Sequence, residues 1–463
     1  MSAEPLALPS VPAGGAPYLL GNYAPVAAEL TLSGGLEVEG ALPPWLDGML
    51  VRNGPNPVLV PDPHHYHWHN GDGMVHAVEF SGGRALAYRN RLVRTRKLAS
   101  VVGTSRPPGP AEPVEGPANT NVIWHGGRLL ALAETGFPYR LSADLDTLCV
   151  EDFDATLTGP MTAHPRTDPD TGALVAFGYD VFGPPYLRYY ELDAAGAMVH
   201  GTSVSIPRAT MQHDFCVSER RVGFLDLPVV FDLTMARGGA SLPFRWATET
   251  RARLGLLDRL ADGAEVRWLS LEPCFVLHVM NAFDDGDDFV VDLCRYDRAF
   301  DGTNEAGALD TAAFPRLERW RVTPDGTVEA TQLDDRPVDY PRVDEQLAGR
   351  PYRFGYCTEL TRERGVDTGS GLVRYDLVRD EASHHRPGPG RAPGEPIFVR
   401  APDGRADDEG VVLSFVYDAG RDATDVVVID GTAFDGAPLA TVHLPTRVPF
   451  GLHGSFVPAD RYR

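Results

Sequence analysis

Short apolar runs alternate with glycine-containing turns along most of this chain, and this alternation limits the possible folds more than any other feature. Strand-like segments flank Gly82-Gly83, Gly126-Gly127, Gly172 and Gly326, and a looser version surrounds Gly196. Glycine at a turn tip permits the positive φ angles that tight β-hairpins require. The pattern therefore predicts an all-β sandwich, barrel or propeller.

The length of the chain favours one of these architectures. A single sandwich rarely needs more than ~250 residues, whereas seven four-stranded blades of ~50 residues, with their loops, would use all 463 residues. We therefore expect a single seven-bladed β-propeller domain over residues 1–463. The sequence contains no clean repeat, so the number of blades does not follow from periodicity alone.

Two segments are expected to lie outside the blades. Residues 1–30 have little periodicity and should form an N-terminal arm that lies against the body or stays mobile. Residues 232–260 include the apolar run from Leu242 to Leu257 and look helical. We expect this segment to form a small cap of helix and loop over the axial site; a packed surface helix is the alternative.

Charge and cysteine content exclude several classes of function. A net charge of -22 argues against nucleic-acid binding and against simple electrostatic attachment to anionic lipid. The five cysteines contain no C-x-x-C pair, which argues against a disulfide framework or a thiolate metal site. We see no secretory signal and no apolar run of ~18 residues that could span a membrane. The prediction is a cytoplasmic protein.

The candidate metal ligands are four histidines that lie far apart in the sequence: His164, His213, His278 and His453. In a propeller, the innermost strand of each blade faces a common axis, so one histidine from each of four blades can meet there. The sequence intervals from His164 to His213 and from His213 to His278 are each about one blade long. Four neutral imidazoles around one ion suit iron, copper, zinc or nickel, but not calcium or magnesium.

Three acidic residues could support these ligands. A ligating imidazole usually has its other ring nitrogen held by a carboxylate. Glu134, Asp339 and Glu395 are the candidates, because each is flanked by apolar, strand-forming residues and a buried acid needs a partner. A single histidine beside apolar residues is more often a hydrogen-bonded core residue than a ligand, so the prediction depends on all four histidines meeting.

A second group of histidines is interpreted differently. His64, His65, His67 and His69 are expected to form a polar strand edge leading into the Gly71-Asp72-Gly73 turn, with a metal site as the weaker alternative. The chain has no G-x-S-x-G nucleophile elbow, no dinucleotide-binding glycine motif and no Walker loop. These absences argue against serine hydrolases of that type and against nucleotide-binding enzymes.

As a whole, the chain resembles the carotenoid cleavage oxygenases, a family that includes apocarotenoid oxygenases and stilbene-cleaving dioxygenases. The matching motifs follow in order along the sequence: Arg52-Asn53-Gly54-Pro55-Asn56-Pro57, Gly71-Asp72-Gly73-Met74-Val75-His76-Ala77, Ala118-Asn119-Thr120-Asn121, Thr162-Ala163-His164-Pro165, His213-Asp214-Phe215, Gly394-Glu395-Pro396-Ile397-Phe398-Val399, Asp407-Asp408-Glu409-Gly410-Val411-Val412-Leu413-Ser414 and His453-Gly454-Ser455-Phe456-Val457-Pro458. This resemblance implies a seven-bladed propeller with non-haem Fe(II) on its axis.

The resemblance also implies roles for the candidate residues. The four histidines would bind Fe(II), and Glu134, Asp339 and Glu395 would hold their rings. The family normally has Glu at the middle of these three positions. Asp339 is one methylene shorter, so its carboxylate would reach a histidine through a water or after a backbone shift.

Further family positions surround the expected iron. Thr120 falls where the family has a small side chain beside an open iron position. Leu277 and Tyr296 match positions that line the substrate tunnel. Met211 lies two residues before His213 and would face the same way on a strand, so we expect it to contact substrate as well.

The chemistry implied by the resemblance is cleavage of one conjugated carbon–carbon double bond by O2, which gives two carbonyl products. Stilbene- and phenylpropene-cleaving members tend to have a lysine just before the first of the three acids, where this chain has Ala133. We therefore favour a carotenoid or apocarotenoid substrate, with a stilbene or phenylpropene as the alternative.

Other functional classes remain open at this point. A non-oxidative isomerohydrolase would use the same four-histidine iron without consuming O2, and a binding module would retain the iron only as a vestige.

An apolar patch around the tunnel mouth, for which Leu242–Leu257 is the candidate segment, would allow peripheral contact with a membrane without basic residues.

Overall fold

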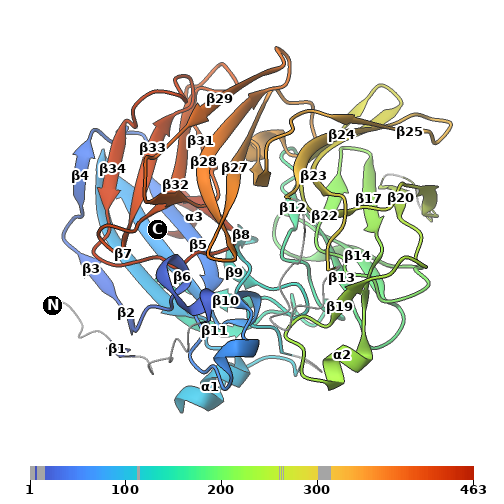
Figure 1. Ribbon diagram of the computed structural model, residues 1–463, viewed down its shortest axis with the longest axis horizontal. Coiled ribbons are helices and arrows are strands. Elements are labelled where there is room, and N and C mark those ends of the chain that lie inside the picture. The colour runs from blue at the N-terminus through green and yellow to red at the C-terminus, as the bar shows by residue number, and fades with distance from the viewer. Residues whose placement is uncertain are drawn as a thin grey trace.

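The structure is a computed structural model that describes residues 6–7, 16–111, 115–259, 261, 263, 265–300 and 314–463. Within these residues the chain forms seven antiparallel sheets of at least four strands, and two small two-stranded sheets. Figure 1 shows the larger sheets standing around a common centre, with the N-terminal strands beside the C-terminal ones. The predicted all-β, seven-bladed architecture is confirmed.

Five of the large sheets are four-stranded and follow the chain in order. The first three contain, in chain order, β8 (Asn121–His125), β9 (Arg128–Leu132), β10 (Tyr139–Leu141) and β11 (Thr147–Val150); β12 (Arg166–Thr167), β13 (Leu174–Tyr179), β14 (Leu187–Leu192) and β15 (Met198–Val204); and β16 (Phe215–Val217), β17 (Arg221–Asp226), β20 (Arg253–Asp258) and β21 (Arg267–Ser270). The next two contain β22 (Phe275–Asp285), β23 (Asp288–Tyr296), β24 (Arg316–Val322) and β25 (Val328–Gln332); and β26 (Val338–Arg342), β27 (Phe354–Glu363), β28 (Val366–Asp376) and β29 (Glu381–His385).

The two remaining large sheets join the ends of the chain and close the ring. One contains β3 (Thr31–Ser33), β7 (Arg84–Leu92), β6 (Gly73–Ser81), β5 (Gly48–Pro55) and β35 (Gly454–Pro458). The other contains β30 (Arg391–Pro393), β31 (Ile397–Arg400), β32 (Gly410–Asp418), β33 (Ala423–Asp430), β34 (Ala440–His443) and β4 (Glu37–Gly40). Each combines N-terminal and C-terminal strands, which holds the ring shut through backbone hydrogen bonds.

Few other elements are present in the described residues. The two small sheets pair β1 (Leu6–Ala7) with β2 (Ala28–Glu29) and β18 (Val229–Phe231) with β19 (Phe244–Trp246). The helices are α1 (Arg96–Val102), α2 (Leu233–Arg237), α3 (Ala459–Tyr462) and the 3-10 turns η1 (Pro17–Leu19), η2 (Gly21–Tyr23), η3 (Pro63–His65), η4 (Trp68–Asn70) and η5 (Glu345–Leu347). No helix of the described residues has the length and apolar character needed to cross a membrane.

The core is divided among the gaps between neighbouring sheets. Each of the seven gaps contains its own buried apolar cluster. In one of them Phe177 of β13 meets Phe215 of β16 with ring centroids 5.0 Å apart. Burying such a side chain contributes about 1.5–3 kcal/mol. Because every sheet needs a neighbour on both faces, closing the ring completes the core.

In the sheet β12–β15, burial is greatest in a middle strand. All six residues of β13 are buried, whereas five of the seven residues of the edge strand β15 are exposed. Because both faces of β13 are covered, it appears in the sequence as a continuous apolar run without alternation.

The hairpins predicted from glycine turns are present. Gly126 and Gly127 have φ values of 55° and 74° and join β8 to β9. Gly82-Gly83 joins β6 to β7 in the same way. Positive φ at both central residues gives a turn whose twist matches that of the strands.

The expected helix within residues 232–260 is short, and the expectation of helix and loop alone is wrong for two pieces of that segment. Leu233–Arg237 is helical, whereas Phe244–Trp246 and Arg253–Asp258 form β19 and β20. In β20, Gly255 lies directly opposite Trp268 of β21, and a Cβ on Gly255 would come within 2.7 Å of that indole. The apolar spacing suits a helix or a strand, and pairing with β17 and β21 selects the strand.

The described part of the N-terminal arm packs onto the body of the ring. Tyr18, Leu19 and Tyr23 of η1 and η2 are buried, and the Tyr23 ring contacts Phe450 with centroids 4.9 Å apart. Residues 1–5 and 8–15 of the expected arm lie outside the described residues.

Candidate metal centre

Four histidines from four different sheets converge at the centre of the ring. His164, His213 and His453 lie just before the innermost strands β12, β16 and β35, and His278 lies within β22. One ligand atom of each histidine lies within 4.8 Å of the others, and all four side chains are buried. Two sheets separate His278 from His453 along the chain, as their long sequence interval requires. The propeller therefore brings the predicted quartet together.

The ring nitrogens face one another in a way that favours a cation. Nε2 of His278 lies 3.3 Å from Nε2 of His213 and 3.1 Å from Nε2 of His453. In all three rings Nδ1 faces a carboxylate, so the neutral ring has its proton on Nδ1 and a lone pair on Nε2. Facing lone pairs repel one another, and a metal ion bound by all the Nε2 atoms removes that repulsion.

Each of the three predicted acids holds one of these rings. Glu134 Oε1 contacts Nδ1 of His213. Asp339 Oδ1 lies 2.6 Å from Nδ1 of His278, and Glu395 Oε1 lies 2.8 Å from Nδ1 of His453. A carboxylate in this position fixes the tautomer and the ring orientation and makes Nε2 a better donor to a metal.

Asp339 reaches His278 directly. The backbone turns through Tyr340, whose φ of 54° is unusual for a residue other than glycine, and the pairing of β26 with β27 shifts register there. The Asp339 and His278 side chains are thus in contact without a bridging water. Asp339 also accepts hydrogen bonds from the Tyr296 hydroxyl at 2.9 Å and from the Tyr340 amide at 2.9 Å.

The acids are held in their ionised form. Burial raises the pKa of Asp339, but its contact with His278 and its hydrogen bonds from Tyr296 and the Tyr340 amide outweigh burial, and the net pKa is lowered. Burial likewise raises the pKa of Glu395, but the positive charge of Arg342 and the hydrogen bonds from His453 and the Gly454 amide prevail, and the net pKa is lowered. The carboxylates can therefore accept the Nδ1 protons of the histidines at neutral pH.

His164 differs from the other three histidines. None of the described residues hydrogen-bonds to its Nε2 atom. Burial, followed by the neighbouring histidines, places its pKa far below the usual value, and burial lowers the pKa of His453 to about 4. Both rings are therefore neutral at pH 7, as metal ligands must be.

Thr120 lies in the segment next to His453. Its carbonyl accepts a hydrogen bond from the His453 amide at 2.9 Å, and its hydroxyl donates to Asn119 Oδ1 at 3.0 Å. The hydroxyl is thus occupied by Asn119. The expected place of Thr120 beside an open metal position remains a prediction.

The predicted substrate contacts separate into two groups. Leu277 and Tyr296 line a cavity of about 120 Å³ that reaches His213 and His278. Met211 is not among the described residues that line this cavity; it packs into the apolar core instead. Its expected orientation assumed a strand, but Met211 precedes β16, so the alternation of side chains does not apply to it.

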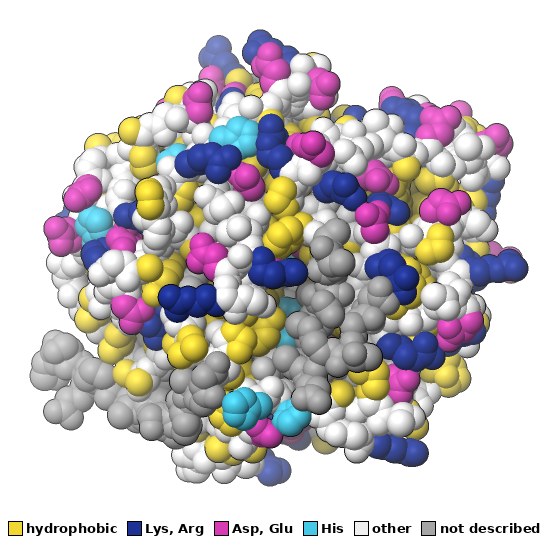
Figure 2. Space-filling view, in the orientation of Figure 1, with side chains coloured by type: hydrophobic (Ala, Val, Ile, Leu, Met, Phe, Trp, Pro, Cys, Tyr) yellow, Lys and Arg dark blue, Asp and Glu magenta, His cyan; other side chains and the backbone are white. Residues whose placement is uncertain are grey.

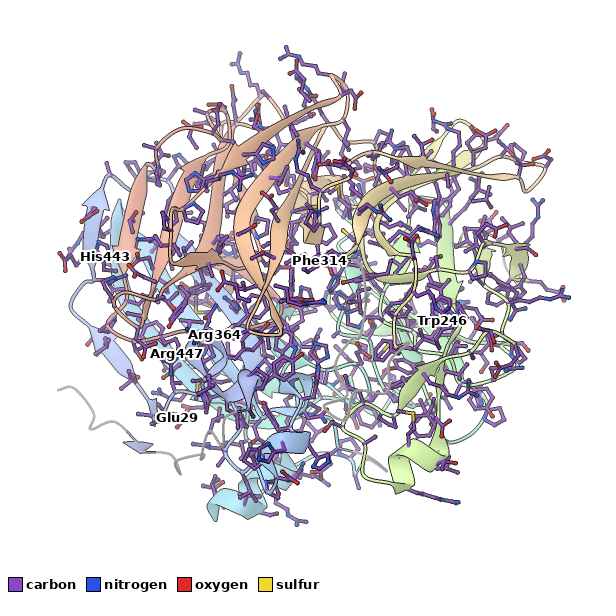
Figure 3. The ribbon with its side chains drawn as sticks, viewed as in Figure 1. Glu29, Trp246, Phe314, Arg364, His443 and Arg447 are labelled. Carbon is purple, nitrogen blue, oxygen red and sulfur yellow. The ribbon has the colours of Figure 1, made fainter. Side chains whose placement is uncertain are left out.

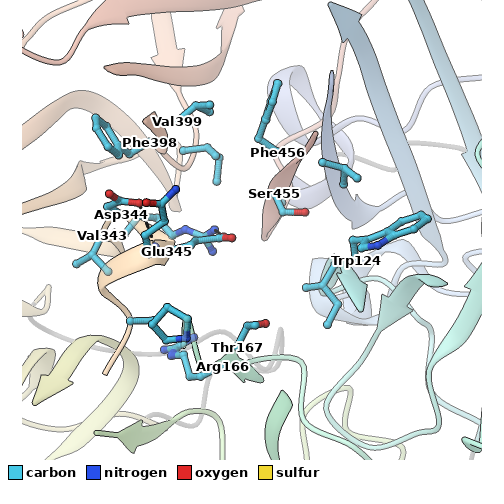
Figure 4. Close-up of a pocket in the computed structure, with 18 of the residues that line it drawn as sticks. Trp124, Arg166, Thr167, Val343, Asp344, Glu345, Phe398, Val399, Ser455 and Phe456 are labelled. Atoms are coloured by element: carbon cyan, nitrogen blue, oxygen red, sulfur yellow. Dashed lines mark hydrogen bonds and ion pairs between the residues drawn. The ribbon is translucent and has the colours of Figure 1, made fainter. Parts of the chain in front are cut away.

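A second, larger cavity of about 600 Å³ approaches the histidines from another direction and is lined by His164, His278 and His453. Figure 4 shows its wall, with Trp124 and Phe456 on one side and Asp344 on the other. Charged side chains such as Arg166 and Asp344 line it. Apolar side chains such as Ile123 and Phe398 line it as well, so both cavities combine apolar with polar and charged walls.

The smaller cavity also extends toward the surface. Arg362 and Asp367 line its outer part and form an ion pair at 2.7 Å, with their side chains 37% and 35% exposed. The guanidinium of Arg362 lies 5.0 Å from the centre of the Phe314 ring, which Figure 3 shows near the middle of the molecule.

The prediction of a polar strand edge over residues 64–69 is wrong. Asp62 accepts a hydrogen bond from the His64 amide and starts η3, and His67 and His69 belong to the turn that follows. His67 is buried and His69 is half-buried, and both line the smaller cavity. The four histidines were noticed in the sequence, but they lie in or beside two 3-10 turns, where the alternation of side chains along a strand does not apply.

On the face drawn in Figure 2, acidic and basic side chains are interspersed over the described residues, without a continuous basic patch. The net charge of the chain is -22.

The residues of the centre fit a transition metal. Four imidazole nitrogens, three of them on rings held by carboxylates, suit iron, copper, zinc or nickel and do not suit the oxygen-seeking calcium or magnesium. Four ligands would leave open positions on a six-coordinate ion, so such a centre could also bind small molecules.

Comparisons with known proteins place this chain in one protein family. The model of the family described as retinal pigment epithelial membrane protein matches residues 23–458. A carotenoid cleavage oxygenase of Mycobacterium tuberculosis is 35% identical, over 96% of this chain and 97% of that protein. A carotenoid 9,10(9',10')-cleavage dioxygenase of Crocus sativus is 32% identical, over 95% of this chain and 89% of that protein.

Solved structures agree with these relatives. The lignostilbene dioxygenase of Pseudomonas brassicacearum superposes with a TM-score of 0.86 at 28% identity and covers 98% of this chain and 100% of its own. A cobalt-substituted apocarotenoid oxygenase of Synechocystis gives a TM-score of 0.83 at 28% identity, over 93% of this chain and 96% of its own.

Proposed function

Because this chain belongs to the carotenoid cleavage oxygenase family, we propose that it is a non-haem Fe(II) dioxygenase that cleaves a conjugated double bond of a carotenoid or apocarotenoid. The observation that carries the proposal is the convergence of four buried histidines, three of them backed by carboxylates. His164, His213, His278 and His453 would bind the iron, and Glu134, Asp339 and Glu395 would orient the ligands.

The proposed reaction balances without an added reductant. One C=C bond and the O–O bond of O2 are broken, and two C=O bonds form, so that each product contains one oxygen atom. When bound, Fe(II) supplies an open-shell centre at which O2 becomes reactive. The chain needs no flavin or nicotinamide for this chemistry.

The protein's own residues have three tasks in this proposal. The four imidazoles contribute no charge, so the ion keeps its full positive charge. The carboxylates hold the rings through Nδ1 and keep Nε2 free for the metal. The smaller cavity, through Leu277 and Tyr296, would place the substrate beside His213 and His278 and exclude water from the bond to be cut.

The cavity walls also suggest how the substrate lies. About 120 Å³ accommodates the segment of a conjugated chain beside the metal but not a whole carotenoid. A longer substrate would extend past the lining residues toward Arg362 and Asp367. Burial of apolar area, at about 25 cal/mol per Å², would supply most of the affinity.

A stilbene or phenylpropene is the second candidate substrate, and the likeness to lignostilbene dioxygenase favours it. The residue before Glu134 is the buried Ala133, which cannot hold a phenol as a lysine would. We therefore place carotenoids and apocarotenoids first. An isomerohydrolase with the same iron would give no cleavage products.

The experiment is product analysis by mass spectrometry with purified, iron-loaded protein and a panel of carotenoids, apocarotenals and hydroxystilbenes. We expect two carbonyl fragments from at least one apocarotenal. His453→Ala, which removes a ligand, is the matched negative control. Cleavage of hydroxystilbenes alone would contradict the substrate class, and isomerised products without cleavage would contradict the reaction.

The proposal includes a cytoplasmic location with peripheral contact to a membrane, where such substrates dissolve. All five cysteines are free thiols, which is consistent with a reducing compartment. Leu233 of α2 and the nearby Phe182 are exposed, and Phe182 packs on Phe231 with ring centroids 5.8 Å apart. This apolar surface is the candidate for membrane contact in place of the predicted Leu242–Leu257, because Leu254 and Leu257 are buried in the core.

A further inference from the structure

A buried ion pair connects the segments of two central histidines. It joins Arg166, two residues after His164, to Asp214, the residue after His213. The Arg166 Nη2 atom lies 3.1 Å and 2.9 Å from the two carboxylate oxygens of Asp214, whose side chain is 1% exposed. A buried charge is costly without a partner, and the chemistry proposed above gives this pair no role. Its place beside two ligands therefore needs an explanation of its own.

The same pair also holds the segment of a third ligand, His278. The Val279 amide donates to Asp214 Oδ2 at 2.8 Å, and Arg166 Nη2 donates to the Val279 carbonyl at 3.0 Å. β22 is an edge strand of its sheet, so its outer N–H and C=O groups have no neighbouring strand. The ion pair satisfies one such N–H and one such C=O, as a paired strand would. It therefore links three sheets at residues beside their ligands.

The strand β22 is irregular at this point. Its pairing with β23 shifts register between Val276 and Val279, and again between Val279 and Asn281. Such bulges interrupt the ladder and turn side chains in a new direction. His278 lies within the first shift, so a regular ladder does not set the direction of its ring. The two contacts at Val279 hold the strand between the shifts.

His164 depends most on this pair, because none of the three acids of the centre hydrogen-bonds to its ring. Its position therefore follows from its backbone. On the N-terminal side, the Asn121 side-chain amide donates to the Ala163 carbonyl at 2.7 Å, and the His164 amide donates to the Thr162 hydroxyl at 2.9 Å. On the C-terminal side, Arg166 provides the anchor to the sheets of two other ligands.

We propose that Arg166 and Asp214 are positioning residues that hold the ligand segments in register and support His164 in place of a carboxylate. The inference rests on the metal centre of the proposed function and adds a fourth supporting group to it. Arg166 and Asp214 would act through the ligand segments, without binding the metal themselves. The other three rings are each held by an acid as well, so loss of Arg166 should affect His164 most.

The test measures metal affinity after the ion pair is broken. In Arg166→Met, the Asp214 carboxylate keeps the Phe215 and Val279 amides as donors, each at 2.8 Å, so the buried charge is not left without partners. Competition with a chelator in the absence of O2 measures the affinity for Fe(II) and for Co(II). We expect Arg166→Met to weaken both by about 10–100-fold, as loss of a group that orients a ligand typically does.

Arg319→Met is the matched control. Arg319 binds Asp292 through Nε and Nη2 at 2.7 Å each, and their side chains are 26% and 0% exposed. This pair joins β23 to β24 within one sheet, and its hydrogen bonds go to no residue beside the four histidines. Arg319→Met should lower the urea midpoint of unfolding as Arg166→Met does, because each breaks a buried pair. Its metal affinity should stay within about twofold of the wild type.

Cobalt supplies a readout that general destabilisation does not move. The visible absorption bands of bound Co(II) depend on the number and geometry of its nitrogen ligands. At saturating Co(II), Arg166→Met should change these bands in the same direction as His164→Ala, whereas Arg319→Met should keep the wild-type spectrum. In the His164→Ala background, Arg166→Met should weaken metal binding by less than about threefold, because the ligand that it supports is already absent. An undiminished further loss would overturn the assignment to His164.

Two more variants and the outcomes complete the test. Arg166→Lys, which keeps the charge and a donor, should regain part of the affinity. Asp214→Asn replaces Arg166→Met if that variant does not fold, with the same expectation. Wild-type metal affinity in the Arg166→Met or Asp214→Asn protein, or an equal loss in Arg319→Met, would overturn the inference even if the protein cleaves apocarotenals. A selective loss in a protein that cleaves nothing in air would support the inference and overturn the proposed reaction.

Discussion

The Nε2 atoms of His278 and His453 lie 3.1 Å apart at the centre of the ring, although each ring directs its Nδ1 proton to a carboxylate. Two acceptors at this distance are stable only with a cation beside them. Metal binding should therefore stabilise the folded protein as well as enable its chemistry.

The first prediction concerns metal removal. Iron present at 100 to 1,000 times its dissociation constant should add about 3–4 kcal/mol to the free energy of unfolding. Differential scanning calorimetry of the protein before and after chelation measures this change as a fall in Tm. His164→Ala should show a smaller metal-dependent difference. An identical Tm with and without iron would contradict the proposed site.

The second prediction concerns Asp339. Asp339→Asn keeps the size of the side chain but weakens the hold on Nδ1 of His278, and loss of such a partner typically lowers metal affinity 10–100-fold. Competition with a chelator of known affinity measures the effect. Asp335→Asn, at an exposed aspartate nearby, is the control and should bind iron as the wild type does. Unchanged affinity in Asp339→Asn would show that the carboxylate does not support the ligand.

The third prediction separates substrate contacts from core residues. Leu277→Trp should fill the smaller cavity and lower turnover more than about tenfold, although overpacking will also cost about 1–3 kcal/mol of stability. Iron content should stay at the wild-type level. Met211→Leu conserves volume at a core position outside the cavity and should leave turnover within about twofold. Parallel metal analysis and product assays distinguish these effects.

The fourth prediction concerns pH and the buried His76. Its Nδ1 atom lies 2.9 Å from the Tyr88 hydroxyl, and burial lowers its pKa from 6.5 to about 3. The unfolded chain therefore takes up a proton before the folded chain does. Stability is fully present above pH 6.5 and is lost as the pH falls toward 3. At pH 5 the loss from His76 is about 2 kcal/mol.

The comparison that isolates this effect uses His76→Gln, which does not titrate. Urea unfolding of the wild type and of the variant at pH 7 and pH 5 gives the two pH-dependent losses of stability. The loss should be smaller in the variant by about 2 kcal/mol. Equal losses in both proteins would mean that His76 titrates normally in the folded state.

Much of the fold follows from local sequence signals. The Gly82-Gly83 and Gly126-Gly127 turns predicted their hairpins because positive φ angles at both positions leave the backbone few alternatives. The four histidines could be selected because an axial site accepts one side chain from each inner strand. These signals act over a few residues or follow directly from ring geometry.

The errors arose where tertiary contacts decide between local alternatives. The spacing of Leu254, Leu256 and Leu257 suits a helix or a strand, and only pairing with neighbouring strands makes it β20. The positions of His67 and His69 depend on a side-chain cap at Asp62 and on a distant asparagine, Asn119. Asp62-Pro63 is a helix-start signature that the prediction did not use, whereas the contact with Asn119 has no signature in the sequence.

Oxygen uptake measured against product formation tests the central claim most directly. Iron-loaded protein is mixed with an apocarotenal in an oxygen electrode, and the carbonyl products are quantified by mass spectrometry. The account predicts one O2 consumed for each pair of carbonyl fragments, no product without O2, and no uptake by His453→Ala. Product formation at an undiminished rate in the absence of O2 would contradict it.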